Sequence, residues 1–171
     1  FYLQADMFKQ ARRELQVAEG DAFNAAKVRR SRKRIRDLDY FSNVNIENVP
    51  GSAEDKAIVK VEVEEKSTGS LSIGVGFATD SGPLIDLGIK ERNLLGRGQR
   101  ISLNTSLAAQ KTTFNLAFTE PYFLDREVSA GFDIFHTATD LQDTQSLNSR
   151  RTGVGVRLGY PLGEDLRQSL Q

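Results

Sequence analysis

The chain has 171 residues with 23 basic and 23 acidic side chains, so its formal net charge at pH 7 is zero. This balance argues against a polyanionic partner such as nucleic acid. The chain has no cysteine, which excludes a disulfide framework and a thiolate metal site. No run approaches the ~18 apolar residues of a membrane-spanning helix, but barrel strands need only about 9–11 residues each. Because the chain begins at Phe1, we expect it to be part of a longer or processed protein.

The first 40 or so residues show helical periodicity. Gly20 is a stop signal for a first helix, and Asn24 is a suitable N-cap for a second one. The apolar stripe of the first predicted helix consists of Phe8, Ala11, Leu15 and Ala18. The stripe of the second consists of Ala25, Val28, Ile35 and Leu38. Each stripe is spaced to lie on one side of its helix, so both helices are expected to pack on a common core.

The second predicted helix is strongly basic outside its apolar stripe. The basic side chains are Lys27, Arg29, Arg30, Arg32, Lys33, Arg34 and Arg36. We favour a solvated helix face as the explanation, with contact to anionic lipid heads or an acidic partner as the alternative. A nucleic-acid interface is the least favoured interpretation, because the chain as a whole carries no net positive charge.

Two strands are predicted after the helices. Val44 and Ile46 alternate with asparagines, a turn is expected at 50–52, and Ile58–Glu64 alternates again. Two helices on one face of a small sheet would bury the stripes. The sequence therefore predicts an α+β domain over residues 1–66 in the order helix, helix, strand, strand, with a first strand expected before Phe1.

From residue 67 onward the pattern changes to strands without intervening helices. In the first, Leu71, Ile73, Val75 and Phe77 alternate with Ser72, Gly74, Gly76 and Ala78. The apolar rows of the next five are centred on Ile85–Ile89, Ile101–Leu107, Phe114–Phe118, Val128–Ile134 and Val154–Tyr160. Turns are expected at 80–82, 93–98 and after Pro121, and a polar loop is expected over 137–151.

About six antiparallel strands of a transmembrane β-barrel are the preferred interpretation of residues 67–171, because each strand has an apolar face and a small or polar face. A soluble sandwich is the alternative, since it would hide the same apolar rows in a core. Six strands cannot close a typical spanning barrel, so further strands are expected after Gln171.

Catalytic and metal-binding patterns find little support. His136 is the only histidine and is placed at a strand end, where a surface or interface role is expected. The group Glu62, Glu64 and Glu65 ends an alternating strand and is interpreted as a solvated face. No Gly-x-Ser-x-Gly elbow and no dinucleotide-binding pattern occurs. We therefore expect no enzyme activity, no cofactor and no metal.

The backbone of the first barrel strand is the remaining candidate site. A terminal strand in lipid must pair its N–H and C=O groups, and an incoming strand can do this by β-augmentation. Gly74 and Gly76 would weaken such an edge, since each costs roughly 0.5–1 kcal/mol relative to alanine. The alternative is that these glycines only relieve crowding inside the barrel.

Five segments resemble the BamA family, whose members are central subunits of the outer-membrane β-barrel assembly machinery. These segments are Glu19–Asn24, Leu38–Val44, Ser67–Phe77, Asn93–Gly98 and Glu120–Phe123. The resemblance covers about residues 11–171. It implies a fifth POTRA domain in the periplasm and a sixteen-stranded barrel in the outer membrane. It also implies that 93–98 is a periplasmic turn and that 137–151 lies outside.

The resemblance further implies that the protein folds and inserts other outer-membrane proteins. The client-strand edge would then be Ser70, Leu71, Ser72, Ile73, Gly74, Val75, Gly76 and Phe77. Glu19 would contact an accessory lipoprotein, and outer-membrane lipid would surround the barrel. A POTRA-containing translocator or secretion pore is one alternative, and an outer-membrane enzyme with a catalytic domain elsewhere is another.

Overall fold

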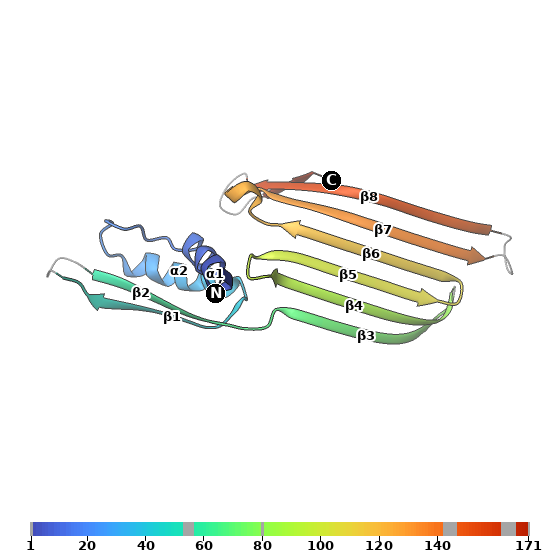
Figure 1. Cartoon of the computed structure of the whole chain (residues 1–171), viewed down its shortest axis with the longest axis horizontal. Coiled ribbons are helices and arrows are strands. Elements are labelled where there is room, and N and C mark those ends of the chain that lie inside the picture. Colours follow the sequence, from blue (N-terminus) through green and yellow to red (C-terminus); the bar gives the residue numbers. More distant parts are fainter. Residues whose placement is uncertain (1, 53–56, 80, 142–146, 162–166, 171) are drawn as a thin grey trace. The chain divides into compact units, whose positions relative to one another are not determined.

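The computed structural model describes residues 2–52, 57–79, 81–141, 147–161 and 167–170. The chain forms two compact units, Phe1–Thr68 and Gly69–Gln171 (Figure 1). The first contains two helices and a two-stranded sheet, and the second is a single antiparallel sheet. Among the described helices, none is both long and apolar enough to span a membrane.

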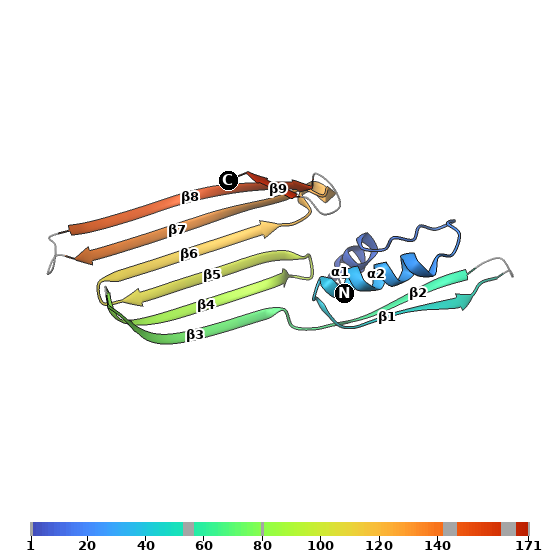
Figure 2. The same ribbon diagram turned by 180° about the vertical axis from the view of Figure 1, so that it is seen from behind.

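The first unit packs its helices on one side of a short sheet. Its elements are α1 (Tyr2–Arg13), α2 (Ala25–Asp37), β1 (Phe41–Pro50) and β2 (Ala57–Glu65). The strands pair antiparallel, with Val44 opposite Val63 and Ile46 opposite Val61. Figure 2 shows α2 running along this sheet. The predicted order of helices and strands is confirmed.

The core of this unit is formed by both helices and β1, and partly buried valines of β2 pack against it. Its buried apolar members are Ala11, Ile35, Tyr40, Phe41, Val44 and Ile46. Ser31 is fully buried beside Ile35 on α2, where its Oγ accepts from Gln16 N at 2.8 Å and donates to Lys27 O at 2.9 Å. Ala25, which the sequence placed in the apolar stripe, is exposed. The stripe is thus completed by a small polar residue whose hydroxyl is satisfied by backbone groups.

The first helix ends earlier than the sequence predicted. It stops at Arg13, not near Ala18, and Glu14 N and Leu15 N close it with bonds of 3.2 Å to Ala11 O and Arg12 O. These tighter bonds, three residues apart, are a common way to end a helix. Leu15 still packs against the core from the segment that follows. The apolar spacing therefore marked Ala11 and Leu15 correctly as core residues. It was wrong for Phe8 and Ala18, which are exposed, and for the end of the helix.

The second unit is a seven-stranded antiparallel sheet whose strands neighbour one another in chain order (Figure 1). The strands are β3 (Gly69–Ala78), β4 (Gly82–Leu94), β5 (Gln99–Ala108), β6 (Lys111–Glu120), β7 (Ser129–Leu141), β8 (Leu147–Pro161) and β9 (Arg167–Leu170). A short 3-10 turn, η1 (Phe123–Asp125), lies between β6 and β7. The antiparallel barrel-type strands are confirmed. The seventh strand was missed, since four residues are too few to show alternation.

The predicted polar loop over 137–151 is mostly strand. β7 continues to Leu141 and β8 starts at Leu147, with Thr137 opposite Arg151. Strand pairing needs only backbone groups and tolerates polar side chains, threonine in particular. His136 consequently lies within β7, not at a strand end. Residues 142–146 and Asp80, which belonged to the predicted loop and turn, lie outside the described residues.

Strand register gathers the apolar rows on one face of this sheet. Ile89 on β4 lies opposite Leu103 on β5, which lies opposite Leu116 on β6. The row continues through Ile134 on β7 to Val154 on β8. Many of these side chains are exposed, Val154 by 71% of its surface. The opposite face carries glycines and polar residues, so the sheet has the two-faced character of barrel strands.

Candidate strand-edge site

β3 lies at one end of the sheet. Its residues pair with β4 along their whole length, from Gly69 opposite Glu91 to Ala78 opposite Gly82. Among the described strands, none pairs with the other edge of β3. Figure 1 shows β3 as the outermost strand of the sheet. In an antiparallel ladder successive residues direct their N–H and C=O groups to opposite sides, so half of the groups of β3 face this open edge.

All eight residues predicted for the client edge lie in β3. Leu71, Ile73, Val75 and Phe77 project from the apolar face and are between 68% and 82% exposed. Ser70, Ser72, Gly74 and Gly76 lie on the opposite face, where Ser72 Oγ donates to Gly88 O at 3.4 Å. The strand thus offers a main-chain edge flanked by an apolar row and a nearly bare row.

The two glycines of β3 are not explained by crowding from β4. A Cβ built on Gly74 would meet Asp86 Cβ at 3.5 Å, and one on Gly76 would meet Leu84 Cδ1 at 3.5 Å. Both distances are ordinary van der Waals contacts. By contrast, a Cβ on Gly131 of β7 would lie 2.6 Å from Phe118 O. Within the described strands, crowding therefore accounts for Gly131 but not for Gly74 and Gly76.

Hydrogen bonds fix the turns at the end of the sheet where β3 begins. Glu91 Oε1 accepts from Asn93 N at 2.8 Å, and Asn93 Oδ1 accepts from Gly98 N at 2.7 Å. Glu120 joins the next turn by accepting from Gln99 Nε2 at 2.8 Å and from Tyr122 N at 3.0 Å. The motifs at 93–98 and 120–123 thus order the turns. Both turns were predicted from the sequence, and the capping role of Asn93 agrees with the preference of asparagine for turns.

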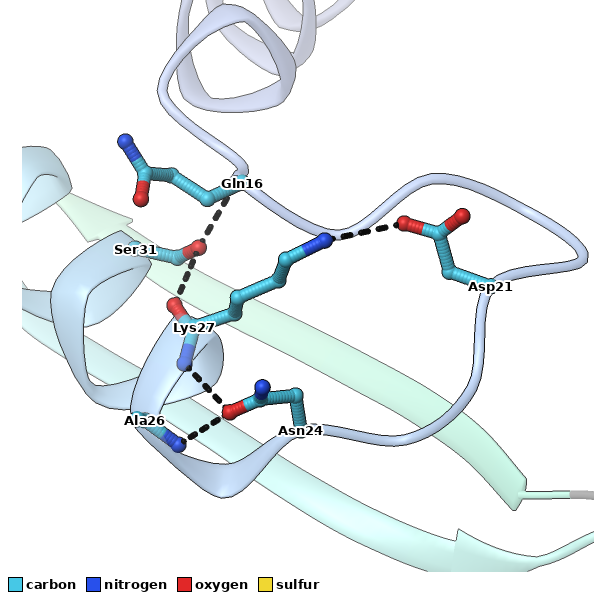
Figure 3. Close-up of polar contacts among 6 residues, drawn as sticks. All are labelled: Gln16, Asp21, Asn24, Ala26, Lys27 and Ser31. Carbon is cyan, nitrogen blue, oxygen red and sulfur yellow. Dashed lines mark hydrogen bonds and ion pairs between the residues drawn. The ribbon is translucent and has the colours of Figure 1, made fainter.

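Glu19 belongs to the connection between α1 and α2, in the other unit. It is exposed in a turn beside Gly20, whose φ is +91°. Figure 3 shows how the connection is held: Asn24 Oδ1 accepts from Ala26 N and Lys27 N at 2.9 and 3.2 Å, and Lys27 Nζ lies 3.2 Å from Asp21 Oδ2. The bond from Lys27 lowers the pKa of Asp21 below its ordinary value. Glu19 is thereby presented on an ordered loop.

The other charged groups form ion pairs, which are exposed except that the carboxylate of Glu14 is buried. Lys60 Nζ lies 2.7 Å from Glu62 Oε1, and hydrogen bonding to Lys60 lowers the pKa of Glu62. On α2, Lys33 pairs with Asp37 at 2.6 Å, and Arg34 pairs with Glu14 at 2.9 Å. Among the described residues, no group of three or more histidine, cysteine or acidic side chains is placed to hold a metal ion.

Two family models match the chain. The POTRA model, described as a surface antigen variable number repeat, matches residues 9–66, and the Omp85 superfamily domain matches residues 93–171. The outer membrane protein assembly factor BamA of Neisseria meningitidis is 36% identical over 160 residues, which is 90% of this chain and 20% of that protein. BamA of Nitratidesulfovibrio vulgaris is also 36% identical, over 89% of this chain and 19% of that protein. The chain belongs to the BamA family.

A solved structure agrees with this assignment. The crystal structure of Haemophilus ducreyi BamA lacking POTRA domains 1–3 matches with a TM-score of 0.78 and 28% identity, over 94% of this chain and 31% of that one. The chain spans about a fifth of the length of the curated BamA relatives. BamA proteins lie in the outer membrane with periplasmic POTRA domains, and the two units of this chain share that location.

Proposed function

We propose that this chain contributes a POTRA domain, residues 1–66, and the first strands of an outer-membrane barrel, residues 67–171, to a protein that folds and inserts β-barrel proteins. The curated BamA relatives are named outer membrane protein assembly factors. The observation that carries the proposal is the position of β3 at the end of the sheet, with one edge unpaired among the described strands.

In this mechanism the client strand binds to the open edge of β3. An unpaired N–H or C=O group in the hydrocarbon region costs several kcal/mol. A client strand that enters the membrane has such unpaired groups, so hydrogen bonding to β3 lowers its free energy. Main-chain hydrogen bonds carry no side-chain information, and one edge can therefore accept many clients. The process needs no bond-making chemistry and no cofactor, which suits a non-enzymatic protein.

Gly74 and Gly76 adapt β3 to this role. Since β4 leaves room for a Cβ at both positions, their absence of side chains is a property of the strand and not a steric necessity imposed by β4. Glycine weakens a strand because it has no side chain to pack and loses more backbone entropy on ordering. A seam between β3 and the last barrel strand would thus open at low cost, while the β3–β4 ladder keeps the strand in place.

Site-specific photocrosslinkers at Ser70, Ser72 and Gly74 of the full-length protein test the proposal. With a stalled client present, crosslinks from these positions to the client are expected. A crosslinker at Asn104, on the same face but in the interior strand β5, is the matched control and should capture no client. Capture of the protein's own last strand alone, with clients present, would contradict the edge mechanism.

The exposed turn at Glu19 is proposed to contact an accessory lipoprotein. Its ordered loop presents a carboxylate to the periplasm, and Glu19→Lys should therefore weaken co-purification of that lipoprotein. Glu47→Lys reverses an exposed charge on β1 of the same unit and serves as the control. Equal retention of the lipoprotein by the parent and by Glu19→Lys would exclude this role while leaving the edge mechanism intact.

A further inference from the structure

On one face of the sheet the apolar side chains reach the strand ends in β3–β5, whereas in β7 and β8 they give way to polar ones. Over β3–β5 it remains apolar to the strand ends, at Phe77, Pro83 and Leu107. On β7 and β8 it changes from apolar to polar where His136 lies opposite Thr152, followed by Arg150 opposite Ala138. Ile134 and Val154 form the last apolar pair before this boundary. A localised polar group therefore adjoins the lipid-facing rows on these two strands.

This boundary lies at the outer end of the sheet. β3 starts at Gly69, directly after the periplasmic unit, and Gly69 lies opposite Glu91, close to the 95–98 turn. That end is therefore periplasmic. His136 and Arg150 lie toward the opposite end of β7 and β8, which is directed to the outer leaflet. This step depends on the membrane location of the family and not on the proposed client edge.

The polar group has the donors that a phosphate requires. His136 Nδ1 lies 2.6 Å from Thr152 Oγ1, which orients the imidazole ring. Arg150 is exposed on the same face and forms no ion pair with any described residue. It is diagonal to His136 across the strand pair, a relation that separates side chains by about 7–8 Å, within reach of an arginine. Guanidinium groups bind phosphate oxygens in a bidentate manner.

The polar side chains next to Arg150 would place a bound phosphate on one side of it. His136 and Thr152 lie on the inner side of Arg150, toward the apolar rows, and among the described residues Asp140 lies on its outer side, opposite Asn148. His136 and Thr152 therefore offer polar groups to an anion on the inner side of Arg150. A phosphate bound on this inner side would lie next to the apolar pair Ile134 and Val154.

We propose that Arg150, His136 and Thr152 bind the phosphate on the headgroup of an outer-leaflet lipid, whose acyl chains lie along the apolar rows of β7 and β8. A free anion would use only the donors, whereas a lipid also covers the exposed side chains of Val154 and Val156, which are 71% and 65% exposed. The continuity of donors and apolar rows therefore favours a lipid as the occupant.

The proposal is tested by titrating the full-length protein in detergent with bisphosphorylated lipid A, using native mass spectrometry. Arg150→Gln should weaken binding about fivefold, the effect of roughly one basic residue at a membrane surface. His136→Phe should also weaken binding while keeping an aromatic ring. The same lipid with its phosphates removed should bind the parent and both variants equally.

Arg151→Gln is the matched control, because Arg151 is adjacent and equally cationic but lies on the opposite face, across from Thr137. It should bind lipid A as the parent does. Equal losses in Arg150→Gln and Arg151→Gln would show a general charge effect and overturn the site, as would unchanged binding in Arg150→Gln. Heat-modifiable migration on gels confirms that each variant retains its barrel, and no client insertion enters the measurement.

Discussion

Gly131 and Gly74 show how one residue type serves two purposes in the same sheet. The Cβ of alanine at 131 would lie 2.6 Å from the backbone oxygen Phe118 O, whereas at 74 it would make an ordinary contact. Gly131→Ala should therefore lower the free energy of unfolding of the full-length protein by about 1–3 kcal/mol, as overpacking generally does. Gly74→Ala is the control and should not lower the urea midpoint of the detergent-solubilised protein, because its Cβ makes only an ordinary contact and alanine loses less backbone entropy than glycine.

The Asp21–Lys27 pair should make the folding stability of the first unit depend on pH. The hydrogen bond from Lys27 lowers the pKa of Asp21 below its ordinary value of 3.8. A carboxyl with a lowered pKa in the folded state contributes stability above its ordinary value and loses it as pH falls through the folded pKa. An NMR titration should give a folded pKa below 3.8, and Lys27→Met should raise it toward that value. An unchanged pKa in Lys27→Met would contradict the assigned cause.

Ser31 illustrates a buried residue that sequence reasoning missed. Its type argues against burial, yet its hydroxyl is satisfied by Gln16 N and Lys27 O inside the core. The partner Gln16 comes from the segment after α1, which the sequence assigned to the helix itself. A polar residue is buried when a distant backbone group meets it, and such a group is not visible in local periodicity.

The alternation of apolar and polar residues located the strands but not their ends. β7 and β8 continue past the apolar rows because the ladder is made by the backbone, and polar residues such as Thr137 remain in register. The first helix stops at Arg13 although apolar spacing continues to Ala18, because Gln16 N bonds to Ser31 instead of continuing the helix. Periodicity identified the core residues Ala11 and Ile35, whereas the ends of the elements depend on tertiary contacts.

The shared apolar face of the strands gives a direct prediction for solvent accessibility. Spin labels in the full-length protein at Ile73, Leu87, Leu103, Leu116 and Phe132 should contact lipid and broaden with a lipid-soluble relaxation agent. Labels at Ser72, Asn104 and Asp133 on the opposite face should respond to a water-soluble agent. The register places each set on one face. The reverse accessibility would indicate a soluble sandwich with these apolar rows in its core.

For the molecule as a whole, the sequence predicted the family and the place of the first barrel strand at the end of its sheet, but one strand too few. The motifs at 67–77 and 93–98 carried the resemblance, and both family models and relatives agree with it. The structure places β3 at the end of the sheet, with one edge unpaired among the described strands. Each described strand of this sheet pairs with its neighbours in chain order, so the series of strands and turns indicated the order, whereas the four residues of β9 were too few to show alternation.

The client-edge mechanism requires β3 to open on one side only, and disulfide locks can separate its two edges. The chain has no native cysteine. Ser72 and Gly88 lie opposite each other, and a Cβ on Gly88 would be 3.8 Å from Ser72 Cβ, which is within the range for a disulfide. The double variant Ser72→Cys/Gly88→Cys should therefore lock β3 to β4 and leave client insertion unchanged.

A second lock joins a cysteine at Gly74 to one on the last barrel strand of the full-length protein. This lock should stop client insertion because it closes the open edge of β3. Reduction releases that edge and should restore insertion. Insertion of a client into liposomes measures both locks. If the lock on the open edge leaves insertion intact, or if both locks abolish it equally, β3 does not act as a one-sided template.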